Sequence, residues 1–154
     1  MQTLTGVRSR LPWYNSPIPD FESFYYAARW AAAFNEGASG GKYHGDGIQE
    51  MRKLIMEKYW VADGMIRGYC YSFWEERQEE YGPFFVHSVA LFQPWLQKLS
   101  CLSNDWESVV GKAEGSRYVE KDLTYNYLVY AYRGVGEYFE LLHQHRALLQ
   151  APGA

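Results

Sequence analysis

Apolar residues along this chain recur mostly every three or four positions, the spacing that gathers them on one face of an α-helix. This spacing continues through 48–73, begins again at Pro83, and returns over 116–150. Segments that alternate apolar and polar residues, as strands do, are few, and the best of them, 84–91, fits helical spacing better. The pattern predicts an all-α fold, a single-domain bundle of about five to seven helices over residues 19–150.

The last helical region, 116–150, carries two neighbouring apolar stripes. One stripe consists of Val119, Leu123, Tyr127, Tyr130, Tyr138, Leu141 and His145. The other consists of Leu128, Ala131, Tyr132, Val135, Phe139 and Leu142. Gly134 and Gly136 interrupt the region, so the helix is expected to break there.

Polar residues near the start of each apolar run predict where the helices begin. Asp20 is expected to cap the first helix, which ends at Asn35 before a glycine-rich loop over 37–47. Asp46 and Gln49, three residues apart, resemble a capping box for the second helix. The second helix is therefore expected to begin as the loop ends.

Two signals in the run that begins at Pro83 predict interruptions. Pro94 lies inside the run, where a proline kinks a helix or begins a new one. Asn104 and Glu107 resemble another capping box, so a separate short helix is expected to begin there.

The first 18 residues show no sustained periodicity and contain Pro12 and Pro17. Residues 1–18 are therefore interpreted as an extended arm, which Leu11 and Trp13 can hold against the helical domain. The start of the chain lacks the apolar core of a signal peptide, and no stretch reaches the roughly 18 apolar residues of a membrane span. These observations predict a cytoplasmic protein that does not enter a membrane.

Charge and cysteine content narrow the classes of function. The chain has a formal net charge of −3, which offers no basic field for a nucleic-acid backbone, so nucleic-acid binding is disfavoured. Cys70 and Cys101 lack the neighbouring ligands of a zinc site and are interpreted as reduced thiols in the helical core.

Aromatic residues are unusually frequent, with 14 Tyr, 8 Phe and 6 Trp. A tyrosine ring is apolar while its hydroxyl needs a partner, so many such rings indicate surfaces suited to recognition. Rings that fit helical stripes are interpreted as core: Phe21, Phe24, Tyr59, Tyr69, Phe85, Phe92, Tyr127 and Tyr130. Rings that fit no stripe are interpreted as recognition residues: Trp13, Tyr14, Tyr43, Trp74 and Tyr81.

An acidic run near the end of a predicted helix is the main candidate binding site. Carboxylates at a helix C-terminus oppose the helix dipole, so local stability does not explain them. Rings beside charge are typical of binding hot spots, which suggests a patch for a partner with a basic surface. The alternative is a solvated helix end that favours solubility. The candidate residues are Trp74, Glu75, Glu76, Glu79, Glu80 and Tyr81, with Tyr43 and His44 as a second patch.

Candidate catalytic and metal-binding groups are sparse. Glu140 and His143 have the spacing of a metal-binding pair, but a carboxylate-bridged metal site in a bundle needs two such pairs. Both residues are therefore interpreted as a solvated face, and no metal or cofactor is expected. His87 has no adjacent nucleophile and is interpreted as a packed or boundary residue.

The leading hypothesis is a non-catalytic protein–protein binding module that uses an aromatic and acidic surface. Its small, acidic, aromatic-rich profile is that of bacterial or phage inhibitor, immunity and adaptor proteins, although no motif identifies a family. The alternative hypothesis is an enzyme or small-ligand binder with a cavity lined by Tyr, His and Glu between helices. The oligomeric state is left open.

Overall fold

Eight helical segments account for nearly all of the residues that the computed structural model describes, which are 16–35, 44–113 and 116–149. No strand occurs within these ranges, and the predicted all-α bundle is confirmed. The helices are α1 (Ile18–Phe34), α2 (Asp46–Glu57), α3 (Tyr59–Gly68), α4 (Tyr71–Glu75), α5 (Gln78–Tyr81), α6 (Pro83–Ala113), α7 (Val119–Gln144) and α8 (Arg146–Leu149).

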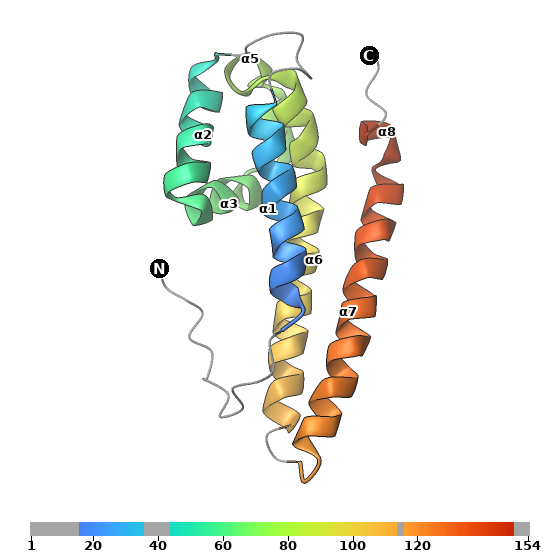
Figure 1. The fold of residues 1–154 in the computed structure, drawn as a ribbon. Coiled ribbons are helices and arrows are strands. Elements are labelled where there is room, and N and C mark those ends of the chain that lie inside the picture. Colours follow the sequence, from blue (N-terminus) through green and yellow to red (C-terminus); the bar gives the residue numbers. More distant parts are fainter. Residues whose placement is uncertain (1–15, 36–43, 114–115, 150–154) are drawn as a thin grey trace.

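The long helix α6 is the axis of the fold (Figure 1). Helix α1 packs antiparallel to α6 as far as Trp106, and α7 runs antiparallel along α6 on another side. Helices α2 to α5 form a smaller layer that packs against α1 and α6 on the side away from α7. In the described ranges, no helix is both long enough and apolar enough to cross a bilayer.

The main core fills the space between α1, α6 and the α2–α5 layer, and it is built largely from rings. The Tyr25 ring meets the rings of Phe92 and Trp95 edge-on, with centroids 5.8 and 5.6 Å apart. Burial of each large side chain of this kind stabilises the fold by roughly 1.5–3 kcal/mol. A smaller cluster around Leu102 and Trp106 joins the start of α1 to the far end of α6.

The helical spacing over 48–73 is divided among three helices, α2, α3 and α4. The backbone leaves the helical region at Lys58, where φ is −144°, and again at Tyr69, where ψ is 139°. The bend at Lys58 turns α3 back toward α1, so that Asp63 reaches a buried arginine, Arg29, on α1. Tertiary contacts across the bend therefore override a continuous helical pattern.

The separate helix expected at Asn104 and the break expected at Gly134 and Gly136 are absent, and no new helix begins at Pro94. Helix α6 continues through Pro94 and Asn104, and α7 continues through Gly134 and Gly136. Buried residues on both sides of Pro94 hold α6 in place, since tertiary packing supplies most of the stability of a helix.

Two predicted helix caps are absent. Helix α1 begins at Ile18, whose backbone N–H donates to the hydroxyl of Ser16 at 3.1 Å, and Asp20 lies inside the first turn. Asp46 is itself the first residue of α2, so it does not cap that helix. The predicted arm, residues 1–18, lies outside the described residues as far as residue 15.

Candidate functional site

Trp74 and Tyr81, the two rings expected to anchor a partner at the surface, are buried. Trp74 has 0% of its surface exposed, and its ring meets Tyr81 and Phe85 edge-on with centroids 5.1 and 6.2 Å apart. Helices α4 and α5 have five and four residues, too few to show a period in the sequence. The interpretation of these two rings as surface anchors is therefore wrong. Both rings pack into the core beneath the glutamates of the acidic run.

The four glutamates of the run are exposed on the outer side of the same two helices. The fold adds Glu50, which is exposed on α2 and close enough to Tyr81 to raise the pKa of its hydroxyl. Burial and Glu80 are the larger causes of that shift. We call this surface the acidic corner, and it consists of Glu50, Glu75, Glu76, Glu79 and Glu80.

A glycine brings the elements of the acidic corner together. A Cβ atom at Gly47 of α2 would lie 2.9 Å from the Tyr81 ring and 3.0 Å from the Glu80 side chain of α5. Glycine therefore permits the close approach of α2 to α5 that places Glu50 in the corner. Sequence reasoning missed Glu50, because it belongs to the corner only through this contact between helices.

A cation, Arg77, lies within the acidic corner. Arg77 approaches Glu80 with Nε 3.9 Å from Oε1, and its guanidinium lies over the Phe73 ring at 4.0 Å. The pair with Glu80 is exposed, and exposed pairs of this length contribute little to stability. Arg77 thus offsets only part of the corner's negative charge.

The predicted second patch is described only in part. His44 is exposed, and its Nδ1 lies 3.5 Å from the amide nitrogen of Gln49. Tyr43 lies outside the described residues. His44 lies two residues before α2 begins at Asp46.

Several rings that were interpreted as core are instead exposed, including Phe24, Tyr59 and Tyr69. The largest group of exposed apolar residues lies on α7, on the side opposite the buried Leu123 and Leu141. Figure 1 shows α7 at the edge of the bundle, with α6 and α1 on one side only. We call this group the aromatic face of α7, and it consists of Tyr125, Leu128, Val129, Tyr132, Val135 and Phe139.

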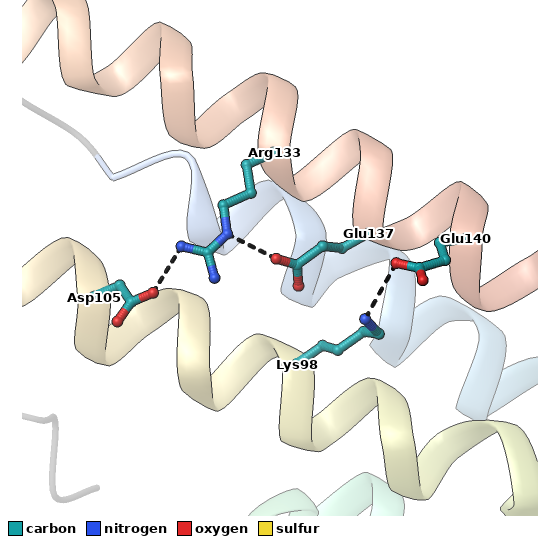
Figure 2. Close-up of polar contacts among 5 residues, drawn as sticks. All are labelled: Lys98, Asp105, Arg133, Glu137 and Glu140. Atoms are coloured by element: carbon teal, nitrogen blue, oxygen red, sulfur yellow. Dashed lines mark hydrogen bonds and ion pairs between the residues drawn. The ribbon is translucent and has the colours of Figure 1, made fainter.

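Charged residues of α7 flank the aromatic face and turn toward α6 (Figure 2). Arg133 donates to Asp105 of α6 and to Glu137 of its own helix, both at 2.7 Å. Hydrogen bonds to these two carboxylates raise the pKa of Arg133 above its ordinary value. Glu140 lies 3.7 Å from Lys98 of α6. These contacts bind α7 to α6 along one edge.

No metal site is found among the described residues. Glu140 and His143 are both exposed, and no group of three His, Cys, Asp or Glu side chains in the described ranges could hold a metal ion. His87 is also exposed on α6, so its interpretation as a packed or boundary residue is wrong.

Both cysteines are free and exposed, so the interpretation of Cys70 and Cys101 as core thiols is wrong. The hydroxyl of Ser72, 3.0 Å from the Cys70 sulfur, lowers the pKa of that thiol. Neither thiol belongs to a recognisable catalytic arrangement within the described structure.

An ion pair is buried between α1 and α3. Arg29 pairs with Asp63 and also donates to the carbonyl of Tyr59 at 3.2 Å, while the Tyr25 hydroxyl donates to Asp63 at 3.1 Å. Burial raises the pKa of Asp63, although Arg29 and Tyr25 oppose that shift. The network ties two helices together inside the core, and its charges are closed off from a ligand.

An open groove of about 630 Å³ lies between the end of α3 and the middle of α6. Gln93 of α6 bridges this region by donating to the carbonyl of Ile66 at 2.8 Å. The described residues that line the groove include Arg67 and Cys70 but neither a histidine nor a carboxylate. The groove therefore has Tyr69 but not the His and Glu of the cavity hypothesised for an enzyme or small-ligand binder.

Comparisons with protein-family models, with curated proteins and with solved structures find no match to this chain. The two surfaces described above, the acidic corner and the aromatic face of α7, are therefore the features from which a function can be derived.

Proposed function

We propose that the protein is a non-catalytic protein-binding module that binds a basic partner surface through the acidic corner. One observation carries this proposal. The fold packs α2 against α5 and α5 against α4, and these helices, with the turn between α4 and α5, carry five exposed carboxylates, of which Glu80 lies 3.9 Å from Arg77.

The rings beneath the acidic corner support this role by holding the carboxylates in place. Trp74 and Tyr81 point inward from the two helices that carry the glutamates outward, so both helices are fixed to the core. Charges on a rigid support lose less conformational freedom when a partner binds. A concentrated field of this kind also speeds the approach of an oppositely charged protein.

Within this proposal, the protein is of inhibitor, immunity or adaptor type and acts in the cytoplasm of a bacterium or of a cell infected by a phage. Its size, its acidic character and its helical fold support that class. The fold alone does not determine the function, so the acidic corner has to be tested directly.

The test is affinity capture of partners from the native host, repeated with a charge-reversed chain. Glu76→Lys with Glu80→Lys should lower the association rate of the captured partner about tenfold or more at low salt, and less at high salt. A matched control, Glu57→Lys with Glu107→Lys, makes the same change in net charge at two exposed positions outside the corner. If both double variants bind the partner like the original chain, the assignment of the acidic corner is wrong.

A further inference from the structure

The aromatic face of α7 is symmetric in sequence about Tyr132. Tyr125 lies seven residues before Tyr132 and Phe139 lies seven residues after it. An aliphatic pair, Leu128 and Val129, lies on one side of Tyr132, and Val135 with Gly136 lies at the mirrored positions on the other side. Steps of three and four residues between apolar positions form the seam of a coiled coil.

The exposure of this face is large for a helix within a bundle. Tyr125, Tyr132 and Phe139 have 67%, 78% and 62% of their surface exposed, and the three aliphatic residues have 40–52%. With roughly 150–250 Å² for a whole ring, the three rings of the face alone expose about 300–500 Å², and the three aliphatic residues add to that area. The largest apolar patch on a typical monomer is about 300–600 Å², and a stable interface buries about 800 Å² on each partner.

Charges are placed at the ends and edges of this face, not within it. Figure 2 shows Arg133 bound to Asp105 of α6 and to Glu137 of its own helix. Lys121 is exposed before the first ring, and Glu140 is exposed just after the last. The face between these two residues is apolar, so its burial in an interface would leave no charged side chain buried without a partner.

We propose that two copies of this chain associate through the aromatic face, with α7 packed antiparallel to α7 of the second copy about a twofold axis at Tyr132. A twofold interface pairs the same patch on both copies, and a patch symmetric about one residue meets that need. This inference goes beyond the proposed function, because it concerns a different surface and a different partner.

The antiparallel direction follows from charge. It keeps the two Lys121 side chains at opposite ends of the pair, whereas a parallel pair would place them together. Antiparallel helices also oppose their dipoles. A Cβ atom built at Gly136 meets nothing within 4 Å, so the backbone beside Tyr132 is open to close approach by the second copy.

Sedimentation equilibrium on the full chain tests the association. The expected mass at micromolar concentration is twice that of one chain. Tyr132→Glu should weaken association by roughly 30-fold or more, the effect of losing a central hot-spot residue. The matched control, Trp60→Glu, replaces a ring that is exposed on α3 and should leave the dimer intact. A chain that stays monomeric at all concentrations, or a control that dissociates equally, would overturn the proposal.

Cysteine cross-linking tests the direction of the pair. With Cys70→Ser and Cys101→Ser as background, Tyr132→Cys at the axis should form a disulfide with its own copy on oxidation. Tyr125→Cys should not cross-link to itself, because in the antiparallel pair it faces Phe139 of the second copy. Efficient self-cross-linking of Tyr125→Cys would show a parallel pair and overturn the arrangement.

Salt separates this association from the partner binding proposed for the acidic corner. An apolar interface should keep its dissociation constant as salt rises, whereas binding through the carboxylates should weaken. Glu76→Lys with Glu80→Lys should leave the dimer unchanged. If the chain is monomeric and Tyr132→Glu abolishes partner capture, the aromatic face binds another protein and the pairing of two copies is wrong.

Discussion

Gly134 of α7 lies directly against the ring of Phe21 of α1, so close that a methyl group at Gly134 would overlap the ring. This contact brings α1 and α7 together over α6. A glycine that looked like a helix breaker in the sequence is therefore a packing position inside a continuous helix.

The first prediction compares two glycine-to-alanine changes. Gly134→Ala should destabilise the fold by about 1–3 kcal/mol, because the added methyl displaces the Phe21 ring. Gly64→Ala on α3, where a Cβ meets nothing within 4 Å, should stabilise it by up to about 1 kcal/mol through helix propensity. Urea unfolding measures both changes. Equal effects of the same sign would show that the Phe21 contact does not constrain α7.

The second prediction concerns the hydroxyl of Tyr25. Tyr25→Phe should lower the free energy of unfolding by about 1–2 kcal/mol, because the buried Asp63 loses a hydrogen bond. Tyr26→Phe, at a half-buried neighbouring ring, should have a smaller effect. Chemical unfolding of the two variants beside the original chain provides the measurement.

The third prediction is the pH dependence of the same change. Because burial raises the pKa of Asp63, its contribution to stability is largest below the ordinary aspartate pKa of about 4 and falls as pH rises through the raised value. The Tyr25 hydroxyl favours the charged carboxylate, so Tyr25→Phe should destabilise the fold more near pH 7 than near pH 4. A loss that is constant across this range would show that the Tyr25 hydroxyl does not lower the pKa of Asp63.

The fourth prediction separates the packing of Trp74 from binding. Trp74→Ala should destabilise the fold by about 3–5 kcal/mol through the cavity it leaves. Trp74→Phe keeps a ring and removes an indole Nε1 that is buried with no partner among the described residues, so the loss should be near 1–2 kcal/mol. Folded Trp74→Phe should capture partners as the original chain does. Weaker capture by this variant would show that Trp74 contributes to partner binding.

The fifth prediction tests the charges between α6 and α7. Arg133→Met should lower the free energy of unfolding by about 0.5–1 kcal/mol at low ionic strength, and by less at high salt, because the bridge to Asp105 is half-exposed. Arg117→Met removes the same charge at an exposed turn and should have no such effect. Thermal unfolding at two salt concentrations distinguishes the variants.

The all-α class could be predicted because a helix that packs on one face has apolar residues every three or four positions, whichever element it packs against. Helix boundaries were less accessible, since the bend at Lys58 and the continuity through Pro94 depend on contacts with other helices. The spacing of a single chain segment contains no information about those contacts.

The candidate site divides in the same way. The four glutamates of the acidic run could be found from sequence, because charge is visible in a single segment. The inward direction of Trp74 could not be found, since α4 completes hardly more than one turn. Both stripes of α7 were visible, but only the position of α6 shows which of them stays exposed.

In the two short helices α4 and α5, the residues that stabilise the fold differ from those proposed to bind a partner. Their inward rings are held by the core, while every glutamate that they carry points to solvent. Mutations among those glutamates can therefore accumulate without loss of the fold. A lineage that keeps Trp74 and Tyr81 can exchange one pattern of surface charge for another, and related proteins can diverge in partner while the scaffold is inherited unchanged.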